Sequence, residues 1–157
     1  MSLDPLDRAF AAIAEAAPAD ADDWWIIGSA AMVLCGVGGI EPEDVDILGS
    51  RTTIERFLRR WGVEAGEPSP NARFRSYPYV RVQLPGCTPI ETMGDLHVLR
   101  DGEWQPLSPK TRMAVQASGG VLHVPTLEEQ AEILKLFGRE KDLAKLRHIE
   151  RTLEAEG

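Results

Sequence analysis

The sequence has 157 residues, of which 43% are hydrophobic, and this is enough for one compact domain with a hydrophobic core. Its 25 acidic and 17 basic residues give a formal net charge of −8, which repels nucleic acid and acidic membranes at long range. The composition therefore argues against a general DNA- or RNA-binding protein. It does not argue against a small anionic ligand, because a local basic cluster and a metal ion can reverse the sign inside a cleft.

The sequence carries no sign of a membrane or secreted protein. No apolar run approaches the length of a membrane span, and the N-terminal segment lacks the basic and apolar regions of a signal peptide. Cys35 and Cys87 lie far apart without a CxxC pairing, so neither a disulfide framework nor a zinc site is indicated. We expect a cytoplasmic protein without a membrane partner.

The first half of the chain alternates helical and extended patterns. Leu6, Phe10 and Ile13 recur at helical spacing, and Ser50 and Thr52 with Glu55 suggest a capping box at the start of a further helix. In chain order we expect a helix at 5–17, a strand at 24–27, a helix at 30–37, a strand at 45–48 and a helix at 51–61.

The second half begins with a Pro/Gly/Ser/Asn loop at 65–72 and is mostly extended before a helical end. Ser108-Pro109 is typical of a helix start, Thr126 with Glu129 suggests another capping box, and Gly138 interrupts the last helix. We expect extended segments near 72–77, 79–84 and 89–93, a hairpin at 97–106, a helix at 108–117, a strand at 121–124 and helix from 126 to about 153. This order predicts a single α+β (α/β) domain over 1–157, a mixed sheet flanked by helices, with a C-terminal helical segment at 126–154.

Two carboxylates on the second predicted strand are the first candidate site residues. Asp44 and Asp46 are two positions apart, so they point to the same face of a strand while Val45 and Ile47 point into the core. Two ionised carboxylates this close repel each other, and a divalent cation removes that cost. Magnesium prefers oxygen ligands of this kind, together with substrate phosphates.

A Gly-Ser turn between the first strand and the apolar helix is the second candidate. Gly28 lets the backbone approach a ligand closely, and Ser29 adds a hydroxyl donor at the start of a helix, where free N–H groups suit a phosphate. Either feature alone is usually structural. In the order strand, Gly-Ser, apolar helix, acid-x-acid strand, they predict one shared site for a phosphate and a metal.

Over residues 25–48 the sequence resembles the nucleotidyltransferase superfamily, whose founding fold is that of DNA polymerase β. The resemblance rests on Ile26-Ile27-Gly28-Ser29 and on Asp44-Val45-Asp46-Ile47, and it is closest to small bacterial members such as the abortive-infection toxin nucleotidyltransferases. It implies a nucleotidyltransferase-type mixed sheet. It also implies that the Gly-Ser turn holds a nucleoside triphosphate and that the acid pair holds Mg2+ or Mn2+.

The resemblance also implies a third acid and a basic helix. We prefer Glu91 as the third carboxylate, with Asp95 in reserve. The segment from Lys135 to Asp142 is similar to a Lys…Arg-x-Lys-Asp helix of the small members. We expect Lys135 to contact a phosphate and Asp142 to pair with Arg139 if that helix is continuous.

The leading hypothesis is a metal-dependent nucleotidyltransferase that transfers NMP from an NTP to a hydroxyl of a protein, RNA or small molecule. It assigns catalysis and metal binding to Asp44, Asp46 and Glu91, and nucleotide binding to Gly28, Ser29 and Lys135. A second hypothesis is a catalytically inactive binding or regulatory protein of the same fold, a toxin–antitoxin-like partner. Glu41 and Glu43 motivate it, because similar proteins often have a basic and a hydroxyl residue there. A third is an acidic interaction module, in which the acid pair and Ser29 share no cleft.

Overall fold

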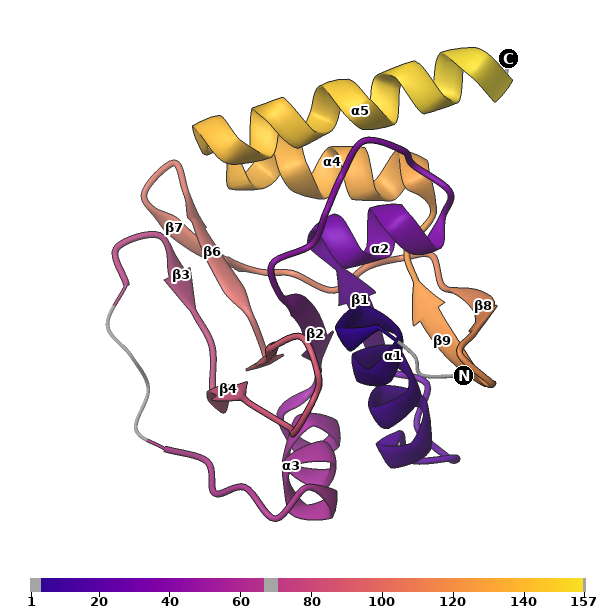
Figure 1. The fold of residues 1–157 in the computed structure, drawn as a ribbon. Helices are drawn as coiled ribbons and strands as arrows, with labels where there is room; N and C mark the ends of the chain where they lie inside the picture. The colour runs from indigo at the N-terminus through magenta and orange to yellow at the C-terminus, as the bar shows by residue number, and fades with distance from the viewer. Residues whose placement is uncertain (1–3, 67–70, 157) are drawn as a thin grey trace.

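The computed structural model describes residues 4–66 and 71–156, and Figure 1 shows its helices and strands. The helices are α1 (Pro5–Ala16), α2 (Gly28–Leu34), α3 (Arg51–Arg60), α4 (Leu127–Phe137) and α5 (Glu140–Glu156). The strands are β1 (Trp24–Ile27), β2 (Val45–Gly49), β3 (Phe74–Arg75), β4 (Tyr79–Val82), β5 (Ile90–Gly94), β6 (His97–Arg100), β7 (Glu103–Pro106), β8 (Met113–Ala117) and β9 (Gly120–Val124). This is the α+β class expected from the sequence.

A four-stranded sheet in the order β1-β2-β5-β4 forms the centre of the molecule. The β2–β5 pair is parallel, whereas β1–β2 and β5–β4 are antiparallel. Alternate residues of β2 enter two different cores: Val45 and Ile47 pack on one face, and Leu48 packs on the other. Asp46 shares the face of Leu48 because side chains alternate along a strand.

Helices cover the two faces of this sheet unequally. Helices α1 and α3 contribute Phe10, Ile13 and Phe57 to the larger core, which lies on the face away from Asp46. On the face of Asp46, α4 supplies Ile133 and Phe137. Figure 1 shows α5 lying across α4 on this side of the molecule, with α2 just below them. The acidic strand therefore faces the C-terminal helix pair.

The break that Gly138 suggests in the C-terminal helix is present. Gly138 adopts a left-handed conformation with φ of 66°, and its N–H donates to the carbonyl of Leu134 at 2.9 Å. This is a glycine C-cap of the kind that ends many helices. Helix α5 then starts in a new direction, so side chains before and after residue 138 do not follow one helical periodicity.

The predicted helix at 108–117 is wrong. Residues 113–117 form strand β8, which pairs antiparallel with β9. Ser118 and Gly119 both have positive φ, at 52° and 81°, as a two-residue hairpin turn requires. Gly119 therefore closes a hairpin and does not end a helix. Pairing with β9, which the local sequence does not reveal, outweighs the Ser-Pro signal.

The other predicted elements are confirmed, apart from small shifts of their ends and the two capping boxes. Ser50 does cap α3 by accepting the N–H of Thr53 at 3.2 Å, but Glu55 forms an ion pair with Arg51 at 3.5 Å. At the start of α4 the carboxylate of Glu129 accepts N–H groups from the segment before β8. The expected loop at 65–72 lies partly outside the described residues. None of the described helices combines the length and apolar character needed to span a membrane.

Candidate active site

A single row of residues crosses the central sheet and brings the chemically important side chains together. Ile27 on β1 pairs with Asp46 on β2, Asp46 pairs with Glu91 on β5, and Glu91 pairs with Arg81 on β4. Directly paired residues on neighbouring strands point to the same face of the sheet. The row thus runs from Ile27, which precedes Gly28, through two carboxylates to a guanidinium.

Three carboxylates form a compact cluster on this row. One oxygen each of Asp44, Asp46 and Glu91 lies within 4.8 Å of the others. Asp44 joins because it is two residues before Asp46, and Val45 between them is fully buried in the opposite core, as is Ile47. The cluster combines a local i, i+2 spacing with a parallel strand pairing that joins segments about 45 residues apart.

Asp46 is the least compensated member of this cluster. Its Oδ1 is shielded from solvent and has no hydrogen-bond partner within the described part of the chain. Burial, followed by the charges of Asp44 and Glu91, raises the pKa of Asp46 well above its usual value of 3.8. The ammonium of Lys145 acts in the opposite direction. An ionised Asp46 therefore favours a further positive charge at this place.

Gly28 lies against the same carboxylate. A Cβ at this position would be 2.9 Å from Oδ2 of Asp46, and the backbone φ is +75°, a conformation that favours glycine. The side chain of the preceding Ile27 provides no cap for the N–H groups at the start of α2. Gly28 and the acid cluster are thus adjacent, whereas a cleft shared by the acid pair and Ser29 stays a prediction.

On the opposite side of the cluster from Gly28, β4 contributes a cation and a phenol. Nη1 of Arg81 lies 2.8 Å from Oε1 of Glu91 and 3.6 Å from Oδ2 of Asp44. Tyr79 lies two residues earlier on β4, and burial together with the charges of Glu91 and Asp46 raises the pKa of its hydroxyl. This tyrosine therefore stays protonated beside the carboxylates at neutral pH.

A cavity of about 460 Å³ opens beside the acid cluster. Its wall combines acidic residues, basic residues in and just before α5, two uncharged polar residues, and apolar or aromatic residues. They are Ile27, Asp44, Asp46, Asn71, Phe74, Ser76, Tyr79, Glu91, Met93, Leu96, Phe137, Arg139, Lys141 and Lys145. This volume is typical of small-molecule sites, and the wall offers both metal ligands and cations for an anion.

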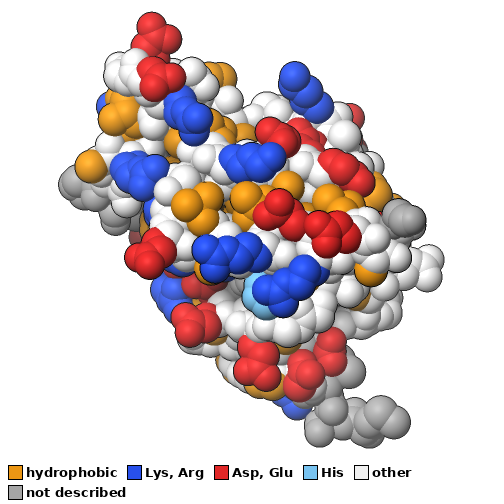
Figure 2. All heavy atoms as spheres, turned by 90° about the horizontal axis from the view of Figure 1, so that it is seen from above, with side chains coloured by type: hydrophobic (Ala, Val, Ile, Leu, Met, Phe, Trp, Pro, Cys, Tyr) orange, Lys and Arg blue, Asp and Glu red, His pale blue; other side chains and the backbone are white. Residues whose placement is uncertain are grey.

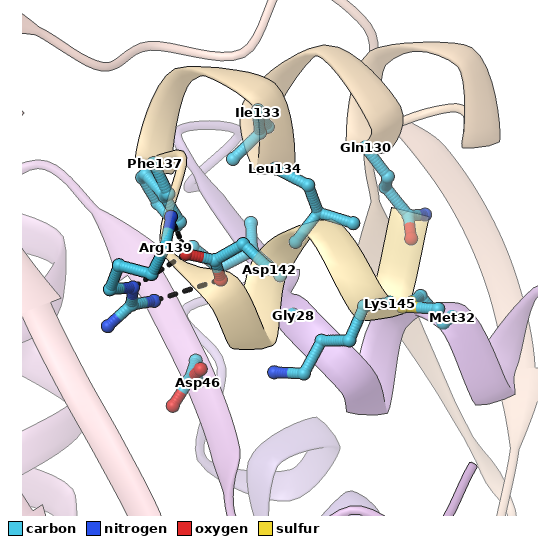
Figure 3. Close-up of a pocket in the computed structure, with 11 residues that line it drawn as sticks. Gly28, Met32, Asp46, Gln130, Ile133, Leu134, Phe137, Arg139, Asp142 and Lys145 are labelled. Carbon is cyan, nitrogen blue, oxygen red and sulfur yellow. Dashed lines mark hydrogen bonds and ion pairs between the residues drawn. The ribbon is translucent and has the colours of Figure 1, made fainter. Parts of the chain in front are cut away.

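A smaller cavity of about 30 Å³ joins the acid cluster to the helix pair. In Figure 3 the ammonium of Lys145 extends from α5 toward Asp46, with Gly28 behind them. Arg139 lies across the same opening, and its Nε donates to Oδ2 of Asp142 at 2.6 Å. Asp142 is 1% exposed, so this pairing fixes the first turn of α5 and thereby the place of Lys145.

Comparison with solved structures identifies the fold. The structure of a presumed nucleotidyltransferase from Thermotoga maritima superposes with a TM-score of 0.73 and 23% sequence identity, covering 89% of each chain. This chain has the nucleotidyltransferase fold. The antibiotic-resistance factor ANT(2″)-Ia is also similar, with a TM-score of 0.51, 14% identity, and coverage of 94% of this chain and 81% of that one. No protein-family model and no curated protein sequence matches this chain.

Two candidate site residues predicted from the sequence, Asp95 and Lys135, make their side-chain contacts outside the acid cluster. Asp95 accepts the backbone N–H of Arg51, in the first turn of α3, at 3.1 Å, while Glu91 lies in the cluster. Lys135 lies on α4 before the break at Gly138, and its Nζ pairs with Glu132 at 3.2 Å. It is absent from the described linings of the two cavities at the acid cluster.

Lys145 is the residue at this site that the sequence interpretation missed. Its signal was present: Lys141 and Lys145 are four residues apart on one helix, so they lie on neighbouring turns of the same face. Seen from above in Figure 2, acidic and basic side chains are interspersed on the surface formed by the helix pair. Only the position of α5 over the sheet, which the sequence does not give, selects these two lysines.

Proposed function

We propose that this protein is a metal-dependent nucleotidyltransferase, which transfers NMP from an NTP to a hydroxyl acceptor and releases pyrophosphate. The observation that carries the proposal is the contact between the Gly28 turn and a cluster of three carboxylates, Asp44, Asp46 and Glu91. The nucleotidyltransferase fold supports the proposal, since this chain shares it with a presumed nucleotidyltransferase.

The residues of the cluster fit a divalent cation. Asp46 offers a shielded, unpaired Oδ1 among the described residues, and Asp44 and Glu91 supply further carboxylate oxygens within 4.8 Å. Carboxylate oxygens are the ligands that Mg2+ and Mn2+ prefer. When bound, such a cation would neutralise the charge that develops on the phosphates during transfer.

The chain's own residues would divide the remaining tasks among themselves. Gly28 and Ser29 would seat the phosphates against the acid cluster, and Lys145 with Lys141 would neutralise the outer phosphates from α5. The acceptor oxygen would attack the α-phosphorus as the bond to pyrophosphate breaks, and its proton would pass to a carboxylate such as that of Glu91. The role predicted for Lys135 stays a prediction that substitution can test.

The acceptor would be a molecule with a free hydroxyl group. Protein, RNA and small-molecule hydroxyls all fit the chemistry, and the 460 Å³ cavity has room for a small molecule beside the cluster. The similar structure ANT(2″)-Ia is an antibiotic-resistance factor. Antibiotics are therefore a reasoned first panel of small acceptors.

The second candidate is a catalytically inactive nucleotidyltransferase fold that binds or regulates a partner. One observation favours it: Arg81 pairs with Glu91 and approaches Asp44, so a cation of the protein itself already contacts two of the three carboxylates. Exposed Glu41 and Glu43 precede the cluster and oppose the approach of a triphosphate. This candidate predicts no NTP turnover with any metal.

Calorimetric titration of each NTP, with Mg2+ or Mn2+, distinguishes the two candidates. The wild-type protein is compared with the double variant Asp44→Asn/Asp46→Asn, and Asp95→Asn serves as a control with the same chemical change outside the cluster. We expect metal-dependent binding that survives in the control and vanishes in the double variant. Absence of binding of every NTP to the folded wild-type protein would contradict the enzyme and favour the inactive fold.

A further inference from the structure

Arg81 occupies a place in the sheet that the proposed chemistry does not use. It ends the cross-strand row that begins at Ile27, directly opposite Glu91 on the neighbouring strand. Its Nη1 is 2.8 Å from Oε1 of Glu91 and 3.6 Å from Oδ2 of Asp44. One guanidinium nitrogen thus contacts two carboxylates that the proposed metal would share.

Arg81 brings a permanent positive charge to the two carboxylates that it contacts. Its guanidinium stays protonated at any ordinary pH, and hydrogen bonds between ionised groups are stronger than neutral ones. The ion pairs that the described residues make with the cluster are those of Arg81. Lys145 approaches Asp46 from α5, on the other side, and Tyr79 adds a neutral hydroxyl on β4. Arg81 is therefore the cation in direct contact.

The same arginine is free to leave. Its side chain is 53% exposed, and it lies on β4, at one edge of the central sheet. An ion pair with this much solvent exposure is weak, because water competes for both partners. A divalent ion brings twice the charge to the same oxygens, so it has the larger electrostatic attraction to them.

We propose that Arg81 is a resident counter-ion of the acid cluster, which competes with the divalent metal and is displaced when the metal binds. The inference rests on the proposed function, since it takes Asp44 and Glu91 as metal ligands. Arg81 brings one positive charge to the carboxylates of Asp44 and Glu91, and a divalent ion in its place brings two. The arginine weakens metal binding in the absence of nucleotide, so metal loading depends on the phosphates that arrive with it.

Titration with Mn2+ without nucleotide, followed by the electron paramagnetic resonance signal of the free ion, tests this competition. The variant Arg81→Gln removes the charge but keeps a polar side chain, and Arg81→Lys keeps the charge. Arg75→Gln is the matched control, because Arg75 is also exposed on a strand but stacks on Trp104, 4.0 Å from the ring centre. We expect Arg81→Gln to bind Mn2+ about tenfold more tightly than wild type, and the other two variants to remain near wild type.

A second experiment measures the thermal stability of the variants with and without metal. Without its counter-ion the cluster repels itself, so Arg81→Gln should melt below Arg75→Gln without metal and gain more from saturating Mn2+. Equal or weaker Mn2+ binding in Arg81→Gln, with wild-type binding intact, overturns this inference alone. Binding by Arg81→Gln when the wild type shows none supports it. Binding by neither protein, with both folded, overturns the inference and the proposed metal site together.

Discussion

A substitution at Gly28 probes the contact that carries the proposed function. In Gly28→Ala the new Cβ would be 2.9 Å from Oδ2 of Asp46, whereas ordinary contacts of this kind begin near 3.4 Å. The obstacle is the end of a side chain, so the carboxylate moves and the backbone stays in place. Asp46 must therefore shift away from the position at which it meets Asp44 and Glu91.

Two effects of different size follow for Gly28→Ala. The φ of +75° costs an alanine about 1–2 kcal/mol, which lowers the melting temperature of a chain of this length by about 2–8 °C. The displaced carboxylate should weaken Mn2+ binding by about tenfold or more. Differential scanning fluorimetry measures the first effect, and Mn2+ titration measures the second.

The control for Gly28→Ala lies just past the other end of α2. Gly36 has φ of +84°, but nothing lies within 4 Å of a Cβ built on it. Gly36→Ala should therefore lose a similar amount of stability and keep its Mn2+ affinity. Equal Mn2+ affinity in Gly28→Ala and Gly36→Ala would refute the claim that this turn and Asp46 form one site.

Three further predictions concern the charges around the cavity. The raised pKa of Asp46 means that stability present below its unfolded value of 3.8 is lost as the pH rises through the folded pKa. Melting curves of the metal-free protein from pH 4 to 8 should show this loss in the wild type and not in Asp46→Asn. Lys145→Gln should weaken metal-dependent ATP binding about tenfold by calorimetry, and Lys135→Gln less, because Lys135 pairs outside both cavities. An equal loss in the two lysine variants would contradict this ranking. Arg139→Gln leaves the buried carboxylate of Asp142 with the backbone N–H of residue 139 but without the guanidinium, and should cost about 3 kcal/mol in urea unfolding. Adding Asp142→Asn should recover most of that loss, and no recovery would show that the pair is not the cause.

The local sequence pattern was sufficient to predict the strands and the turn that position the acid pair. The run Trp24–Ile27 is fully buried as a strand, and the spacing of Asp44 and Asp46 places both in the cluster. These features depend on the chain's own periodicity, which a sequence displays directly. The Gly-Ser turn was found for the same reason, since glycine marks a backbone conformation that other residues avoid.

Contacts between segments far apart in the sequence could not be derived from the local sequence pattern. The sequence favoured Glu91 over Asp95, but only the parallel register of β2 and β5 places Glu91 beside Asp46, and β8 depends on its pairing with β9. Arg81 enters the cluster through the register of β4, and Lys145 through the direction that α5 takes after Gly138. In each case tertiary contacts, and not local propensity, determine the outcome.

Anomalous diffraction from crystals soaked with Mn2+ and a non-hydrolysable NTP analogue tests the central claim most directly. The account predicts a manganese peak among the carboxylates of Asp44, Asp46 and Glu91, with phosphate density against the Gly28-Ser29 turn and near Lys145. A peak elsewhere, or no peak at the cluster at saturating concentrations, would contradict the account.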